Sequence, residues 1–305
     1  MSPSSSDRYL GIDVIGDVHG EAQKLRRLLE RLGYREKSGV YRHPCRLVVF
    51  LGDFINRGPE IRKTIHIIRS MQMAGEARVI LGNHEYNAIA YARGLAVRAN
   101  PSKHAKIEAQ LAKTLAEYHL RAEDWIELID WLMGLPICLE MHGIRCVHAC
   151  WHKEAVRTVV ESSLGNHITF SDLTETAGPR SRALKILMNG IKITAPASIT
   201  LRKAPLSFRI KWWMNGHLTW REAGYPEEPS LPSSPLPEDL HSSFLSYSLS
   251  NPLTFFGHYG FPKPASPLLP NLACLDFGVA KGGRLGAYRW SFGEKTLSEK
   301  GFVLV

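Results

Sequence analysis

Three short motifs place acidic, amide and imidazole side chains next to glycine residues. In chain order they are Gly16-Asp17-Val18-His19-Gly20, Gly52-Asp53-Phe54-Ile55-Asn56-Arg57-Gly58 and Gly82-Asn83-His84-Glu85, and the isolated histidines His148 and His258 follow. Their mixed oxygen and nitrogen ligands suit Mn²⁺, Fe or Zn²⁺ better than the all-oxygen sites of Mg²⁺. Two such ions lower the pKa of a shared water and hold both oxygens of an in-line displacement. The predicted chemistry is therefore metal-dependent hydrolysis.

Several of these residues suit a particular part of such a centre. Asp53 has two carboxylate oxygens and can bridge two cations, Asn83 offers a neutral carbonyl oxygen, and Arg57 can bind phosphate oxygens through two parallel N–H groups. Taken singly, each motif is weak, because Gly-Asp is common in turns and a lone histidine is more often a core or surface residue. Three motifs in order, each just past an expected strand, favour the functional interpretation.

The elements that must position these residues alternate between strand and helix. Apolar runs predict strands at Leu10–Ile15, Arg46–Leu51 and Arg78–Leu81, and apolar residues at helical spacing predict helices at Glu21–Leu32 and Pro59–Met73. Each motif directly follows one of the three strands, where open α/β sheets bind ligands. Further along, we expect a helix in two pieces over Lys103–Met133 and a hairpin over Ile137–His148 that turns at His142-Gly143. Later strand-like runs predict a second sheet packed on the first; they are Leu253–Phe256, Leu272–Asp276, Leu285–Trp290 and Phe302–Val305.

Length and composition describe an ordinary globular chain. It has 305 residues, of which 44% are hydrophobic and 22% charged, which excludes a mostly disordered protein. No apolar run reaches the roughly 18 residues of a membrane span, and the Ser-rich N-terminus lacks the apolar stretch of a secretory signal. The five cysteines are odd in number, which favours reduced thiols. We therefore expect a cytoplasmic protein without membrane association.

The positive charge is concentrated in one segment. The net charge is +9, and nine basic residues with no acidic residue lie between Thr176 and Arg221: Arg180, Arg182, Lys185, Lys192, Arg202, Lys203, Arg209, Lys211 and Arg221. This segment is either a solvated face or a field that attracts a polyanion. Arg209 and Lys211 alternate on an expected strand, Phe208–Trp213, and are predicted to bind substrate phosphate. The tryptophans Trp212, Trp213 and Trp220 can stack on a base or pack in the core, while the Pro-rich stretch Gly224–Pro237 is expected to be a surface loop of open role.

The motifs resemble those of the calcineurin-like metallophosphoesterases, in particular the phosphoprotein-phosphatase branch with its forms GDxHG, GDxxDRG and GNHE. Within that branch the chain is similar to bacterial diadenosine-tetraphosphate hydrolases. The resemblance covers Ile12–His148 and His258–Trp290, where Asn271–Asp276 and Lys281–Leu285 look like the closing hairpin of the branch. It implies an α/β fold, a central β-sandwich of two mixed sheets flanked by helices in four layers. We expect one domain over residues 1–305, with a basic substrate-side insertion at about residues 150–250.

The resemblance also implies roles for individual residues. Asp17, His19 and Asp53 would hold one metal, and Asp53, Asn83, His148 and His258 the other. His84 would protonate the leaving group, and Arg57 would bind phosphate. The implied cofactors are two divalent ions, with Mn²⁺ expected first and Fe, Zn, Co or Mg as alternatives.

Two departures from the family pattern bear on the substrate. Asn56 stands where the family usually has Asp, so the residue beside His84 supplies no charge and His84 is less readily protonated. A weak general acid affects an alkoxide leaving group more than a phosphate leaving group, so we predict that anhydrides are favoured over phosphoserine. Ala149-Cys150 stands where protein phosphatases usually have Gly-Gly, and Cys150 is expected to be a buried, inert thiol rather than a redox-sensitive one.

Three functions follow as hypotheses. The first is hydrolysis of nucleoside polyphosphates or nucleotide-capped RNA 5′ ends, with an anionic phosphorylated substrate as the only partner expected. The second is Ser/Thr protein phosphatase activity, and the third is a non-catalytic nucleic-acid-binding module. The complete set of ligand residues argues against the third.

Overall fold

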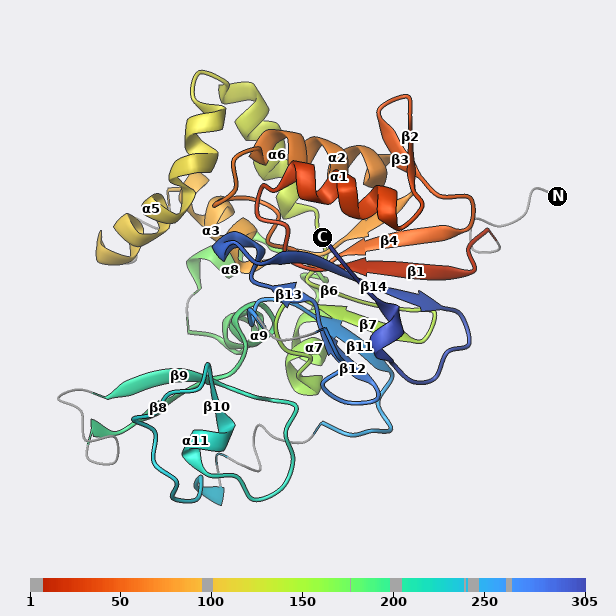
Figure 1. Ribbon diagram of the computed structural model, residues 1–305. Helices are drawn as coiled ribbons and strands as arrows, with labels where there is room; N and C mark the ends of the chain where they lie inside the picture. The colour runs from red at the N-terminus through yellow and green to blue at the C-terminus, as the bar shows by residue number, and fades with distance from the viewer. Residues whose placement is uncertain are drawn as a thin grey trace.

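The computed structural model describes residues 8–94, 101–175, 177–197, 205–238, 240, 247–261 and 265–305. Within these residues, strands and helices alternate through the first half of the chain, as the sequence predicts (Figure 1). No helix in the described part is long and apolar enough to cross a membrane.

The first large sheet carries the three strands that precede the motifs. Its order is β13-β14-β1-β4-β5, with β15 paired to β14. β1, β4 and β5 run parallel, whereas β14 runs antiparallel to β1, so the sheet is mixed. The strand bounds are β1 (Gly11–Ile15), β4 (Arg46–Phe50), β5 (Ala77–Val79), β13 (Asp276–Phe277), β14 (Arg284–Ser291) and β15 (Phe302–Leu304).

The second large sheet is mixed as well and has the order β12-β11-β7-β6. β11 runs parallel to both β7 and β12, and β6 and β7 form the antiparallel hairpin predicted around His142-Gly143. The strand bounds are β6 (Cys138–Met141), β7 (Ile144–Val147), β11 (Leu253–Phe256) and β12 (Leu272–Cys274).

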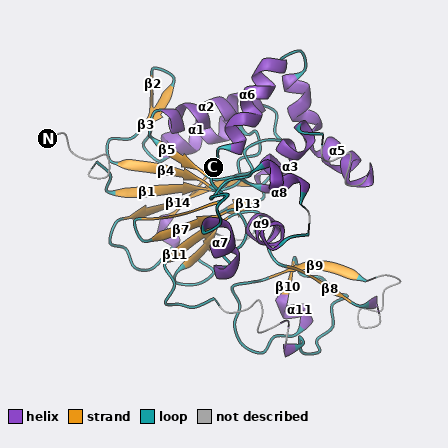
Figure 2. Ribbon diagram, turned by 180° about the vertical axis from the view of Figure 1, so that it is seen from behind, coloured by secondary structure: helices purple, strands orange, loops and turns teal. Residues whose placement is uncertain are grey.

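Alternating side chains show that the two sheets stack with helices outside them. In β4, Val49 packs toward the second sheet in one buried cluster, and its neighbour Phe50 packs in the other cluster with the helices. In β11, Phe255 and Phe256 divide between the same two clusters. Because successive residues of a strand point to opposite faces, each sheet has one face in the sandwich and one face under helices. The predicted four-layer α/β sandwich is confirmed (Figure 2).

Helices cover both outer faces. The amphipathic helices α1 (Ala22–Arg31) and α2 (Ile61–Met73) pack their leucines and isoleucines on the first sheet, and α7 (Lys153–Val160) and α9 (Pro179–Asn189) lie beside the second (Figure 1). The predicted two-piece helix is present as α5 (Pro101–Tyr118) and α6 (Ala122–Met133). The remaining helices within the described residues are α3 (Asn83–Ala92), α8 (Phe170–Thr174) and α11 (Trp220–Ala223), with short 3-10 turns at Val279–Lys281 and Glu299–Gly301.

The basic part of the chain contains more regular structure than its sequence indicates. Helices α7, α8 and α9 were not predicted, and a small sheet of order β10-β9-β8 follows them: β8 (Lys192–Ala195), β9 (Leu206–Ile210) and β10 (Gly224–Tyr225). β9 ends at Ile210, so Lys211 lies just past this strand rather than within the predicted strand Phe208–Trp213. A separate hairpin joins β2 (Arg35–Lys37) to β3 (Val40–Arg42).

Candidate metal centre

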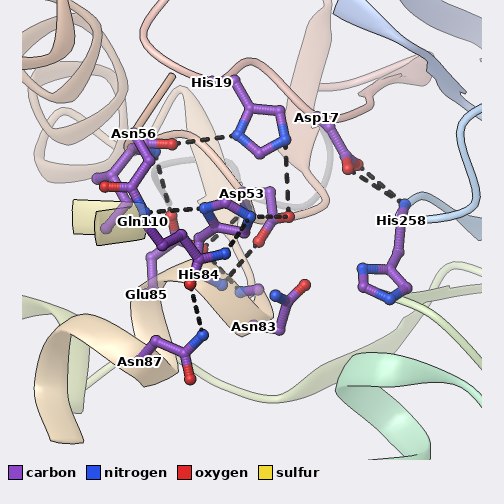
Figure 3. Close-up of polar contacts among 12 residues, drawn as sticks. Asp17, His19, Asp53, Asn56, Asn83, His84, Glu85, Asn87, Gln110 and His258 are labelled. Atoms are coloured by element: carbon purple, nitrogen blue, oxygen red, sulfur yellow. Dashed lines mark hydrogen bonds and ion pairs between the residues drawn. The ribbon is translucent and has the colours of Figure 1, made fainter. Parts of the chain in front are cut away.

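The loops after five strands converge at one edge of the sandwich. Asp17 follows β1, Asp53 follows β4, Asn83 begins α3 after β5, and His148 and His258 follow β7 and β11. Figure 3 shows Asp17, Asp53, Asn83 and His258 around one small region, together with His19. Parallel strands bring their carboxyl ends to the same edge, which is why residues more than 200 positions apart in the chain meet here.

The backbone of these loops is held in an unusual conformation. His19, Asp53 and His258 have φ angles of 46°, 50° and 68°, in the left-handed region that non-glycine residues rarely adopt. A Cβ at Gly52 would overlap the backbone of Gly82, so the two motif loops approach each other closely at a glycine. Strained conformations of this kind cluster at functional sites, where the surrounding structure maintains them.

Asp53 lies at the centre of two groups of potential ligands. His19, Asp53 and His84 form one group and Asp53, His148 and His258 the other, and within each group the ligand atoms lie within 4.8 Å of one another. One carboxylate oxygen of Asp53 lies 3.4 Å from Nε2 of His148, and the other lies 3.8 Å from Nε2 of His19. A carboxylate shared by two imidazole groups fits a bridging ligand between two divalent ions.

Hydrogen bonds at the far ring nitrogens orient the histidines. Nδ1 of His148 lies 2.8 Å from the carbonyl oxygen of Leu51, and Nδ1 of His19 lies 3.1 Å from that of Ile55. With Nδ1 donating to a carbonyl, Nε2 keeps its lone pair and faces the site, as in metal-binding histidines. Nε2 of His148 also lies 3.0 Å from the Asn83 side-chain oxygen, which places the predicted amide ligand beside it.

Asp17 lies on the other side of the centre, next to His258. Both of its oxygens accept the backbone N–H of His258 at 3.2 Å. Burial and the nearby Asp276 carboxylate raise the pKa of Asp17. Asp276 was not assigned to the site from the sequence, because the signal there is a single acidic residue in an apolar strand.

Charge within the centre is strongly coupled. Burial opposes the charge on both Asp53 and His148, but their proximity outweighs it. The pKa of Asp53 is therefore held well below its usual value, and that of His148 is raised to about 10. At His258, burial and the neighbouring His148 lower the pKa. An anion surrounded by imidazoles is a site in which a bound cation can replace protons on the histidines.

Glu85 holds the loops of the second and third motifs together. Its carboxylate accepts the backbone N–H groups of Asp53 at 2.8 Å and of Gly82 at 3.0 Å through one oxygen, and those of Phe54 and Ile55 at 3.0 and 3.2 Å through the other. Burial raises the pKa of Glu85 to about 7, with a further contribution from Asp53. Because its carboxylate accepts four backbone hydrogen bonds, this buried side chain links the second and third motifs.

His84 lies between two amides. Nδ1 of His84 is 2.8 Å from the amide nitrogen of Asn56, and Nε2 is 2.8 Å from that of Gln110 (Figure 3). A neutral imidazole has one N–H and one lone pair, so one of these amides must present its oxygen to the ring. The Thr114 hydroxyl donates to the oxygen of Asn56, and the pKa of His84 is lowered to about 3, mainly by burial. Sequence reasoning missed Gln110 and Thr114, since they belong to no motif.

Comparison with known proteins identifies this arrangement. A model of the calcineurin-like phosphoesterase family matches residues 10–221, well over half of the chain. The chain belongs to this family. The protein is therefore a hydrolase that acts on phosphoric ester or anhydride bonds.

Individual relatives support the assignment. An asymmetrical bis(5′-nucleosyl)-tetraphosphatase from Halalkalibacterium halodurans is 38% identical over 119 residues; the match covers 38% of this chain and 45%, less than half, of that protein. A symmetrical bis(5′-nucleosyl)-tetraphosphatase from Hamiltonella defensa is 27% identical over 297 residues, covering 91% of this chain and 92% of that protein. Among solved structures, a serine/threonine phosphatase from Saccharomyces cerevisiae has a TM-score of 0.50 at 15% identity, covering 99% of this chain and 80% of that one. This last match concerns the fold alone.

The phosphate-binding residues proposed for this phosphoesterase lie around the centre at different distances. Arg57 is exposed, has a φ of 64°, and its carbonyl accepts a hydrogen bond of 2.6 Å from Lys113. Arg209 donates to the carbonyl of His258 at 3.1 Å and lies over the ring of Tyr259, so it adjoins the centre. Lys211 lies further along the same segment and lines a separate cavity. Substrate contact by all three remains a prediction.

Two arginines of the basic segment have structural roles. Arg180 pairs with the buried Asp172 at 2.7 Å and donates to the carbonyls of Val159, Gly165 and His167, while Arg221 donates to the carbonyl of Leu231. Arg202 and Lys203 lie outside the described residues. The positive charge of the segment is therefore only partly available to a polyanion. The sequence did not show this, because no motif distinguishes a structural arginine from a surface arginine.

Burial decides between the alternative roles expected for Cys150 and for the three tryptophans. Cys150 is buried and its pKa is raised by that burial, so it matches the expected inert thiol. The other cysteines are unpaired as well. Trp212, Trp213 and Trp220 are all buried in the core, as expected, and Trp213 also borders the cavity that Lys211 lines.

Proposed function

We propose that this phosphoesterase hydrolyses phosphoanhydride bonds of nucleoside polyphosphates at a centre of two divalent ions, with Mn²⁺ as the preferred metal. The observation on which the proposal depends is Asp53, placed between two groups of imidazole ligands. Two relatives are named as bis(5′-nucleosyl)-tetraphosphatases, which supports the choice of substrate class. Asp17, His19 and Asp53 would hold one ion, and Asp53, Asn83, His148 and His258 the other.

The bound ions would supply an activated water and charge stabilisation for the displaced oxygen. The remaining work falls to the protein's own side chains. Arg57, exposed beside the centre, is placed to bind a phosphate oxygen. His84 lies 3.8 Å from an oxygen of Asp53 and would face the leaving group, but its low pKa makes it a poor proton donor near neutral pH.

Asn56 favours anhydrides over alkyl esters. An amide beside His84 leaves the imidazole neutral, whereas an alkoxide leaving group needs a protonated general acid. A phosphate leaving group is stable without that proton. Protein phosphatase activity is the second candidate, because it would need the protonated general acid that Asn56 does not favour. Ala149-Cys150, where protein phosphatases usually have Gly-Gly, does not support it either.

The organisation of the chain follows the same proposal. Residues 1–305 form one phosphoesterase domain, and the segment at about residues 150–250 is an insertion on the substrate side. The nucleotide-capped 5′ end of RNA is a second substrate compatible with an anhydride hydrolase and a basic segment. We place the reaction in the cytoplasm, where unpaired cysteines stay reduced.

A panel of substrates tests the proposal. The enzyme loaded with Mn²⁺ is assayed on diadenosine tetraphosphate, ATP, capped RNA, a phosphoserine peptide and p-nitrophenyl phosphate. We expect diadenosine tetraphosphate to give a higher kcat/KM than the phosphopeptide, and no turnover after removal of metal by a chelator. Preference for the phosphopeptide would replace the proposal with protein phosphatase activity, and inactivity on every substrate would remove the assignment as a working hydrolase.

A further inference from the structure

A cavity of about 600 Å³ lies between the small basic sheet and the large sandwich. Ligand pockets for nucleotides and similar molecules have volumes of about 300–1,000 Å³ and commonly form between two packed units. Trp213 just after β9 and Tyr225 in β10 line it from the basic segment, and Cys274 in β12 and Phe277 in β13 line it from the two large sheets. Gly260 and Phe261, in the loop after β11, line it as well. The cavity is therefore large enough for a nucleoside and is built from both parts of the protein.

The walls of the cavity present aromatic rings. The rings of Tyr225 and Phe261 lie 4.8 Å apart at an angle of 35°, and Trp213 lies 5.7 Å from Phe261. The hydroxyl of Tyr225 donates to the carbonyl of Gly260 at 3.0 Å, so this side chain offers its ring rather than its hydroxyl to a ligand. Aromatic faces bind nucleobases by stacking, whichever base is present.

The cavity directly borders the loop that presents His258. Gly260 follows His258 by two residues and lines the cavity. The thiol of Cys274, in the cavity floor, lies 3.8 Å from the carbonyl oxygen of Gly257, the residue before His258. The cavity therefore adjoins the loop that carries His258.

One cation lies at the cavity and another beside the centre. Lys211 lines the cavity together with the acidic Glu227, and Arg209 donates to the carbonyl of His258, next to the centre. A nucleoside polyphosphate has a base, a phosphate chain and a bond to be cleaved. The apolar rings suit the base, the two cations suit the phosphate chain, and the ligands of the metal centre suit the bond to be cleaved.

A second cavity of similar volume does not have these properties. It measures about 610 Å³ and lies among α1, α2 and α6. Its Arg62 and Arg69 are paired with Asp124 and Glu127, so these charges are satisfied within the protein.

We propose that the aromatic cavity lined by Tyr225 and Phe261 binds the nucleobase of the substrate, with Lys211 at the cavity and Arg209 beside His258 as contacts for its phosphate chain. This inference rests on the proposed function, because it names the part of a nucleoside polyphosphate that the protein recognises. It makes the base, and not the phosphate chain alone, a determinant of turnover.

Phe261→Leu tests the role of the base directly. The kcat/KM of wild type and variant is measured with diadenosine tetraphosphate and with inorganic tripolyphosphate, which has anhydride bonds but no base. Loss of a stacking ring should lower the value for the dinucleotide by about tenfold and leave that for tripolyphosphate within about twofold. Phe292→Leu is the matched control: Phe292 is also half-buried but packs near His142, outside the cavity, so both substrates should be unaffected.

Further measurements keep the test independent of one variant. Tyr225→Leu should have the same selective effect, whereas Tyr225→Phe keeps the ring and should retain the preference. In the wild type, adenosine should compete with diadenosine tetraphosphate but not with tripolyphosphate. Equal turnover of both substrates, unchanged by either leucine variant, would overturn the base pocket and leave the proposed function intact; failure to cleave either substrate would overturn both.

Discussion

Replacing Asn56 with aspartate tests whether this amide sets the choice between anhydrides and alkyl esters. The amide nitrogen of Asn56 lies 2.8 Å from Nδ1 of His84, and burial lowers the pKa of His84 to about 3. A carboxylate at that distance favours the imidazolium and raises such a pKa by about 1–3 units, equivalent to about 1.4–4 kcal/mol. Since the ring is almost wholly neutral at pH 7, the protonated fraction should rise by about 10- to 1,000-fold.

The assay compares kcat/KM for a phosphoserine peptide with that for diadenosine tetraphosphate. Because the alkoxide needs the proton and the phosphate does not, Asn56→Asp should raise the peptide-to-anhydride ratio at least about tenfold. The Thr114 hydroxyl that donates to the Asn56 oxygen can donate to the new carboxylate, so Tm should change little.

The matched control is Asn215→Asp, the same substitution at an amide that donates to the carbonyl of Tyr247 at 2.6 Å. Its ratio should stay within about twofold of wild type, because this amide contacts neither His84 nor Gln110. An unchanged ratio in a folded Asn56→Asp variant would refute the explanation of the amide.

Three other variants address the anchoring carboxylate, the metals and the basic segment. Glu85→Gln places an amide nitrogen against two backbone N–H donors, so the free energy of unfolding in urea should fall by about 2–6 kcal/mol, and a loss under about 1 kcal/mol would contradict the anchoring role. Asp53→Asn should retain fewer than one of about two Mn²⁺ ions per chain after dialysis and lose at least about 100-fold in activity; metal content equal to wild type would exclude bridging by Asp53. Arg180→Met breaks a buried ion pair and should cost about 3–5 kcal/mol of stability without changing KM, whereas a raised KM at unchanged stability would place Arg180 in substrate binding.

The motif-bearing half of the fold could be predicted because its signals are local. Val49 and Phe50 belong to an apolar β-branched run, and Asp53 follows closely after it. Neighbouring residues therefore predict both the strand and the position of the ligand at its end. The proximity of Asp17 and His258 was predicted from the family resemblance and not from periodicity. No local pattern around His258 indicates that it lies near the end of β1.

The second half was harder to predict for a physical reason. Helix α9 buries Leu184 and Leu187 among basic residues, and its charged face concealed the helical spacing. The ion pair of Arg180 with Asp172 joins residues of two unpredicted helices, so the arginine was assigned to the surface field. Gln110 and Thr114 contact the site across more than 20 positions of chain, and such contacts depend on packing rather than on sequence pattern.

Helix α5 explains how the loop after Asp53 keeps its shape. Asn56 and Arg57 have φ angles of 67° and 64°, and left-handed residues of this kind cost about 1–3 kcal/mol each unless other contacts hold them. Thr114 receives the N–H of Asn56 at 3.2 Å, and Lys113 donates to the carbonyl of Arg57.

One turn further along the same helix, Glu117 accepts the N–H groups of Ile61 and Arg62 at 2.7 and 2.8 Å, at the start of α2. Side chains three or four positions apart lie on one helix face, so a single face of α5 holds the amide on His84, the predicted phosphate-binding arginine and the following helix. Asp17, Asp53 and His148 come instead from strand ends of the sandwich. We therefore expect substitutions on this face of α5 to change the preference for leaving groups more than the affinity for metal.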